Sequence, residues 1–144
     1  MRSMIDTPEI RSLSRFLDLD VFRQGVITSN LANIDTPGYR ARDINFRQEL
    51  DRAAWNQFQS ASADTVMSVN GMQSGLQSDG DDAAFTPLAR RVSGLVERPD
   101  GNNVSLERET LLLAETQLRF NVGIQLLRAE FRMLSTAIHE GSTS

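Results

Sequence analysis

Few side chains in this sequence could act as a nucleophile, a proton donor or a metal ligand. There is one histidine, His139, and there is no cysteine, which excludes thiol chemistry, disulfides and cysteine-based zinc sites. All fifteen basic residues are arginine, which removes lysine-based covalent catalysis and the lysine of phosphate-binding loops. Carboxylates are therefore the main groups left for catalysis or metal binding.

None of the carboxylates is arranged for a recognisable chemistry. The acidic run over residues 79–82 lacks the alternating ligand spacing and the closing glutamate of a calcium loop. The pairs Glu107 with Glu109 and Asp18 with Asp20 come with no sequence signal of a pocket, as is typical of solvated helix faces. We therefore expect a protein that is not an enzyme and that has no cofactor and no metal site.

The net charge and the hydropathy pattern limit the partners. A formal net charge of −4 argues against nucleic acid as the main partner. No apolar run is long enough to span a membrane as a helix. The first residues carry no apolar stretch or cleavage site of a secretory signal, so we expect the protein to stay in the cytoplasm or to leave it uncleaved.

The first segment, residues 1–36, is predicted to be the N-terminal helix. Residues 7–9 supply an N-cap threonine, a proline for the first helical position and a first-turn acid. The helix is expected to stop before the Pro37-Gly38 type II turn. Its apolar residues form two stripes. The wider stripe contains Ile10, Leu13, Phe16, Leu17, Val21, Ile27, Leu31 and Ile34, and the narrower one contains Leu19, Phe22 and Val26.

The last segment, residues 104–144, is predicted to be the C-terminal helix, with Ser105 or Asn103 as its N-cap. One apolar residue recurs every seven positions, which is typical of a coiled-coil seam. These residues are Leu106, Leu113, Phe120, Leu127 and Leu134, with Thr110, Gln117, Ile124, Phe131 and Ile138 as the intervening seam positions. A second stripe consists of Leu111, Ala114, Leu118, Val122, Ala129 and Met133.

The middle segment, residues 37–103, is expected to hold a turn, a short helix over about 46–58 opened by Asn45, and a flexible region. Residues 60–84 are acidic and poor in large apolar side chains, which is typical of loosely ordered chain. Residues 91–96 are predicted to form one or two short strands. Charged side chains follow the turn, and they either make intersubunit salt bridges or belong to a solvated loop. They are Arg40, Arg42 and Asp43.

These patterns predict a mainly α-helical fold. The two terminal helices are expected to pack antiparallel as a coiled-coil-like hairpin with a small irregular or short-strand middle segment. Pairing residue 34 near residue 106 would bring Gln24 beside Gln117, and such a polar pair fixes the register of an apolar seam. Each helix has more than one apolar stripe, so assembly with other subunits is favoured over a monomeric bundle covered by the middle segment.

Two strings in this sequence resemble signatures of a known family. The first runs over residues 29–39 and the second over residues 101–109. The first contains Asn30, Leu31, Asn33, Thr36, Pro37, Gly38 and Tyr39, and the second contains Asn102 and Asn103. Together they resemble the terminal signatures of the bacterial flagellar rod and hook proteins, and the short middle segment is similar to that of the proximal rod members.

The resemblance implies a structural subunit of the proximal flagellar rod that polymerises through its terminal helices into a torque-transmitting, export-conducting shaft above the MS ring. It implies type III export without a cleaved signal peptide and a location in the periplasmic rod of the basal body. The implied partners are further copies of the chain, the C-type proximal rod protein, the rod adaptor protein and the MS ring. The alternative is a soluble helical-bundle adaptor or chaperone-like binding module.

Overall fold

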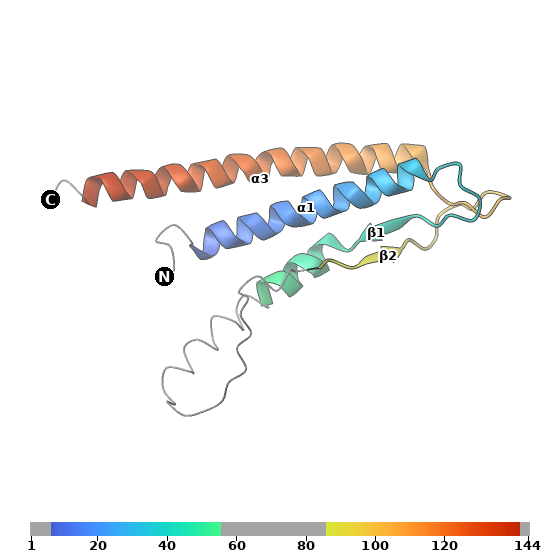
Figure 1. Ribbon diagram of the computed structural model, residues 1–144, viewed down its shortest axis with the longest axis horizontal. Coiled ribbons are helices and arrows are strands. Elements are labelled where there is room, and N and C mark those ends of the chain that lie inside the picture. Colours follow the sequence, from blue (N-terminus) through green and yellow to red (C-terminus); the bar gives the residue numbers. More distant parts are fainter. Residues whose placement is uncertain (1–6, 56–85, 142–144) are drawn as a thin grey trace, which may run out of the picture.

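A computed structural model describes residues 7–55 and 86–141. It confirms the mainly helical fold, in which two long terminal helices run antiparallel beside a small two-stranded sheet (Figure 1). The described elements are α1 (Pro8–Ala32), β1 (Arg42–Ile44), a short helix over residues 46–55, β2 (Ala89–Arg91) and α3 (Leu106–Gly141). None of the described helices combines the length and the apolar character needed to cross a membrane.

Helix α1 begins and ends through side-chain capping. The Thr7 hydroxyl accepts a hydrogen bond from the backbone N–H of Ile10 at 3.3 Å, as expected of an N-cap. The helix ends at Ala32, before the expected limit at residue 36, because Asn33 caps it. The Ser29 carbonyl accepts from the Asn33 backbone N–H at 3.2 Å and from the Asn33 side-chain amide at 2.8 Å, so the side chain of Asn33 folds back onto the last turn of the helix.

Helix α3 has Ser105 as its N-cap. The Ser105 hydroxyl accepts from the N–H of Arg108 at 3.4 Å, and its carbonyl accepts from the N–H of Glu109 at 3.0 Å. The other candidate, Asn103, instead bonds the backbone of Ala41. Helix α3 runs for 36 residues, so it is longer than the 25-residue α1.

The sheet lies at a different place from the one predicted. Strand β1 pairs antiparallel with β2, with Arg42 opposite Arg91 and Ile44 opposite Ala89. The prediction of strands over residues 91–96 was wrong, since β2 ends at Arg91. Gly94 has a φ of 78°, a left-handed conformation that does not continue a strand.

The short helix opens as predicted. The Asn45 side-chain oxygen accepts from the N–H of Gln48 at 3.2 Å. Helical structure continues to residue 55. The expected helix end at residue 58 and the acidic stretch over residues 60–84 lie outside the described residues.

Helix α1 is the central layer of the molecule. It packs against α3 on one side, and β1, β2 and the short helix lie along its other side (Figure 1). Leu19 and Ile27 are buried, and Phe16 packs edge to face on Phe46 with ring centroids 5.3 Å apart. The described part of the middle segment therefore covers one side of α1.

The predicted register of the two helices is confirmed. The Gln24 Nε2 atom donates to Gln117 Oε1 at 3.2 Å across the α1–α3 contact. Asp20 also lies in this part of α1 and is buried. Gln117 is exposed, so its bond to Gln24 marks this alignment of the two helices and does not by itself enforce it.

The seam of α3 is rotated from the one predicted. Its buried line consists of Glu109, Thr116 and Gly123, which are also spaced seven residues apart. An added Cβ at Gly123 would lie 2.8 Å from Leu17 Cδ2 and 3.3 Å from the Phe16 ring, so the helices approach closely here and a larger residue would require these side chains to move. Leu113, Phe120, Ile124, Leu127 and Leu134 remain half-buried at the edge of the contact. The prediction was wrong for the seam residues Leu106, Phe131 and Ile138, which are exposed.

Candidate assembly site

The two sequence strings meet at one end of the hairpin, where Asn30 joins three elements. Its amide nitrogen donates to the Arg42 carbonyl at 2.7 Å and to Glu109 Oε2 at 2.9 Å. Its oxygen accepts from the Arg42 N–H at 3.0 Å and from the Tyr39 hydroxyl at 3.3 Å. Asn30 is fully buried, and its amide is bonded on both sides, so it ties α1 to β1 and α3.

Asn102 closes the turn after α1. Its Nδ2 atom lies 3.0 Å from the carbonyl oxygens of Asn33 and Ile34 and 2.9 Å from that of Thr36. Its Oδ1 atom accepts from the N–H of Val104 at 2.7 Å. One buried side chain thus satisfies carbonyls that the end of α1 leaves without helical partners.

Two glycines allow the loops to touch. Gly38 and Gly101 have φ angles of 71° and 81°, and a Cβ on Gly101 would lie 3.4 Å from Gly38 Cα. The Gly38 N–H donates to the Asp100 carbonyl at 2.8 Å. The Tyr39 N–H donates to Thr36 at 3.2 Å, which closes the predicted Pro37-Gly38 turn.

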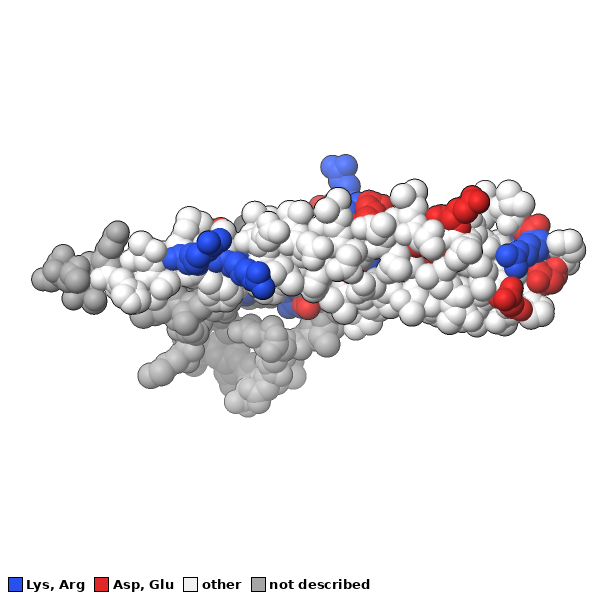
Figure 2. All heavy atoms as spheres, turned by 90° about the horizontal axis from the view of Figure 1, so that it is seen from above, with Lys and Arg blue, Asp and Glu red and all other residues white. Residues whose placement is uncertain are grey.

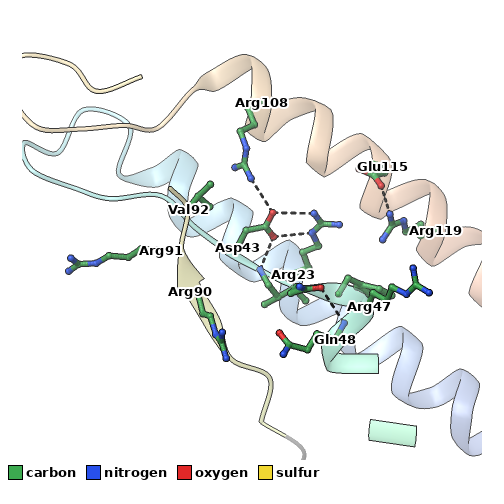
Figure 3. Close-up of a pocket in the computed structure, with 13 residues that line it drawn as sticks. Arg23, Asp43, Arg47, Gln48, Arg90, Arg91, Val92, Arg108, Glu115 and Arg119 are labelled. Carbon is green, nitrogen blue, oxygen red and sulfur yellow. Dashed lines mark hydrogen bonds and ion pairs between the residues drawn. The ribbon is translucent and has the colours of Figure 1, made fainter. Parts of the chain in front are cut away.

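A buried ionic network lies beside Asn30. Arg23 donates to both oxygens of Asp43 at 3.1 Å, and Arg108 donates to Asp43 Oδ2 at 3.1 Å (Figure 3). Arg108 also donates to Glu109 Oε1 at 2.5 Å. The network connects α1, β1 and α3 through charge-assisted bonds.

Two of the charged residues after the turn bond within the chain. Asp43 belongs to the network just described, and Arg40 makes a bidentate pair with Glu97 at 2.6 and 2.7 Å. Asp43 is therefore part of an intrachain network, whereas the Arg40–Glu97 pair is partly exposed to solvent. A role of either residue between subunits stays a prediction.

Asp20 is a buried carboxylate without a hydrogen-bond partner on either oxygen. Burial raises its pKa to about 6; the positive charges of Arg119 and Arg23 oppose that rise, and Glu115 adds to it. It is therefore a destabilising element of the α1–α3 contact in its charged form.

One face of α3 is left uncovered by the rest of the chain. Leu111 is 71% exposed, Leu118 is 66% exposed and Leu126 is 52% exposed. Val122 and Met133 are also exposed, so most of the second predicted stripe is apolar surface. Figure 2 views the molecule from the side of α3 and shows a largely uncharged face, with a basic group toward the end where α1 begins and acidic and basic residues together at the loop end. We call Leu111, Leu118, Val122, Leu126 and Met133 the α3 stripe.

The structure brings together the motif residues of both strings. Asn30, Asn33, Tyr39, Asn102 and Asn103 all bond across the hairpin end. Thr36 bonds Asn33 through its side chain at 3.2 Å. The heptad leucines are spread along α3 and do not join this cluster. Their direct role in assembly, like that of the motif residues, stays a prediction.

Sequence reasoning missed the acids and bases that complete the cluster. Glu109 was predicted to lie on a solvated helix face, yet it is fully buried and accepts a hydrogen bond from Asn30. Arg23 was not singled out, although it stands one residue from Phe22 in the apolar part of α1. A charged residue inside an apolar stripe is the signal that could have found it, since burial requires a partner.

The fold and this site define a helical structural protein with an uncovered apolar helix face. A family model described as "Flagella basal body rod protein" matches residues 22–40. The chain is 33% identical over 116 residues to the flagellar basal body rod protein FlgB of Cereibacter sphaeroides, covering 81% of this chain and 82% of that protein. It is 28% identical over 135 residues to FlgB of Escherichia coli, covering 92% and 94%. It is 26% identical over 132 residues to FlgB of Bacillus subtilis, with the same coverage.

The chain belongs to the FlgB family of flagellar basal body rod proteins. This is a family of structural proteins, and the helical hairpin is consistent with a structural role in the rod.

Proposed function

We propose that the chain is a subunit of the proximal flagellar rod and polymerises through its two terminal helices. The observation that carries this proposal is the α3 stripe, which stays exposed although the hairpin covers the corresponding stripe of α1. A continuous apolar helix face without intrachain cover is typical of a subunit interface.

In the assembly, the α3 stripe packs against terminal helices of neighbouring subunits and the tube transmits torque and conducts exported subunits. The neighbours are further copies of the chain, the C-type proximal rod protein, the rod adaptor protein and the MS ring. The chain reaches the periplasm by type III export without cleavage of a signal peptide.

The three sequence segments have different parts in this proposal. Residues 1–36 and 104–144 form the axial core, and residues 37–103 support it from the side. The motif residues act indirectly, because Asn30 and Asn102 are buried and hold the hairpin end in one shape. A rigid end gives each subunit the same orientation toward the next one.

The test is to locate an epitope-tagged chain in basal bodies purified from a flagellated strain that depends on it for motility. The tag is expected at the MS-ring end of the rod by electron microscopy, and basal bodies with an untagged chain give the background. A tagged chain found in the cytoplasm on other flagellar proteins, and absent from basal bodies, would support the adaptor function instead.

A further inference from the structure

An open pocket of about 610 Å³ lies where α1, β1, the short helix, β2 and α3 meet (Figure 3). Six of its lining residues are arginines, whereas two are acidic, Asp43 and Glu115. The arginines are Arg23, Arg47, Arg90, Arg91, Arg108 and Arg119. We call this site the arginine pocket. Its excess of positive charge contrasts with the formal net charge of −4 of the whole chain.

The two acids of the pocket are already used. Asp43 accepts from both Arg23 and Arg108, and Glu115 pairs with Arg119. Each of these bonds links two parts of the hairpin or two turns of α3. The acids therefore have little capacity to neutralise further guanidinium groups.

Three arginines of the pocket remain unneutralised. Arg47, Arg90 and Arg91 are exposed, and none of them makes an ion pair within residues 7–55 and 86–141. The strand register also places Arg91 directly opposite Arg42. Like charges facing each other across a sheet destabilise it unless an anion lies between or beside them.

The directions of these side chains distinguish between kinds of anion. In Figure 3, Arg91 points to the left, away from the strands, Arg90 points downward, and Arg47 lies on the short helix at the right. The three groups do not converge on one point, as a site for a single phosphate would require. Guanidinium groups spread over an open surface suit several carboxylates spaced along a peptide.

We propose that the arginine pocket binds an acidic peptide segment of a neighbouring subunit, with Arg47, Arg90 and Arg91 pairing with its carboxylates. That the segment belongs to a neighbouring subunit rests on the proposed function. The affinity for an acidic peptide does not rest on it. The pocket is lined by Arg108, Glu115 and Arg119 of α3, and none of the α3 stripe residues lines it, so the contact adds an interface that is separate from the α3 stripe.

Binding of a fluorescent oligoglutamate peptide to the isolated full chain tests the affinity. We expect the Arg90→Gln/Arg91→Gln variant to bind about tenfold more weakly than the unchanged chain at low salt. The matched control is Arg128→Gln/Arg132→Gln, which removes the same charge from exposed positions of α3 outside the pocket, and should change binding by about twofold or less. Equal losses in both variants, or no binding by the unchanged chain, would overturn the proposal.

Inorganic phosphate tests the kind of anion. At equal ionic strength, phosphate is expected to displace the peptide no better than chloride, and a strong displacement would assign a small-oxyanion site instead.

In assembled basal bodies, a photo-crosslinking residue in place of Gln48 on the pocket wall should capture an acidic segment of another subunit, identified by mass spectrometry. Capture of this chain alone, within one molecule, would contradict the intersubunit contact. The two proposals can fail separately. If the isolated chain does not bind the peptide, the arginine pocket proposal is wrong and the proposed rod function is unaffected. If the chain is absent from basal bodies, the proposed rod function is wrong and the measured peptide affinity is unaffected.

Discussion

Amide and guanidinium side chains decide the shape of the hairpin end. Asn30 and Asn102 offer two donors and an acceptor in a compact group, which lets each of them bond several elements at once. The arginine-only composition has a use at this scale, since Arg23 and Arg40 both make bidentate pairs that a lysine would not reproduce. These bonds lie within the chain, so they stabilise the subunit directly.

Replacing Asn102 with alanine is expected to destabilise the folded chain by about 2–3 kcal/mol. The N–H of the buried Val104 would lose its acceptor, and the carbonyls of Asn33, Ile34 and Thr36 would each lose one of their donors; an unsatisfied buried donor is costly. Urea unfolding followed by circular dichroism measures the change. Asn121→Ala on the exposed face of α3 is the matched control and should cost about 0.5 kcal/mol or less. Equal effects of the two substitutions would contradict the role given to Asn102.

Replacing Asp20 with asparagine is expected to stabilise the chain above about pH 6. The folded carboxyl has a pKa of about 6 against an ordinary value of 3.8, so the folded state binds the extra proton between these values. The protonated Asp20 therefore contributes to the free energy of unfolding at low pH, and this contribution is lost as the pH rises through about 6. The variant lacks this loss and should be more stable at pH 7.5 by about 1–3 kcal/mol.

The comparison at two pH values checks the sign of this effect. Near pH 4 the variant and the unchanged chain should have similar unfolding free energies, because Asp20 is then largely protonated in the folded state. Asp18→Asn, on an exposed position of the same helix, should alter stability by about 0.5 kcal/mol or less at either pH. A gain that is equally large at both pH values would show that packing, and not ionisation, causes it.

At the scale of elements, local sequence signals predicted the ends of the helices and the register between α1 and α3 better than they predicted which helix faces are buried. The Thr7 and Asn45 caps, the Pro37-Gly38 turn and the Gln24–Gln117 pair depend on near neighbours or on one alignment, and the structure confirms each of them. The rotation of α3 depends on where the helices approach each other, and the close approach at Gly123 is not revealed by hydrophobic periodicity. Strand β2 was misplaced because its partner lies far away in the sequence.

Two glycine-to-alanine substitutions are expected to have opposite effects on helix packing. Alanine at Gly25 meets no atom within 4 Å and should stabilise α1 by about 0.5–1 kcal/mol through helix propensity. Alanine at Gly123 would bring its Cβ to 2.8 Å from Leu17 and 3.3 Å from Phe16, and Phe16 is held against Phe46. We expect a net loss of about 1 kcal/mol there, measured by thermal unfolding. A gain at Gly123 equal to that at Gly25 would show that the helices do not pack this closely.

At the scale of the whole molecule, the cover of the two long helices is unequal. Helix α1 lies between α3 and the sheet, whereas α3 has a partner on one side and the α3 stripe on the other (Figure 1). Hydrophobic periodicity in the sequence indicated two stripes on each helix, but it did not show which would be covered, because that depends on the path of the middle segment. Folding and assembly therefore use different faces of α3, and the two should be separable by mutation.

The double substitution Leu118→Gln/Leu126→Gln is expected to remove assembly and leave the fold intact. Both leucines are more than half exposed, at 66% and 52%, so the unfolding free energy of the isolated chain should change by about 0.5 kcal/mol or less. Two leucines that become buried between subunits would each lose about 1.5–3 kcal/mol of burial free energy, enough to abolish incorporation into basal bodies and motility. Leu118→Met/Leu126→Met keeps the stripe apolar and is the matched control, expected to assemble. If the glutamine variant enters basal bodies as efficiently as the unchanged chain, the α3 stripe is not the assembly face. This conclusion holds because the predicted loss of interface free energy does not depend on the stability of the isolated chain.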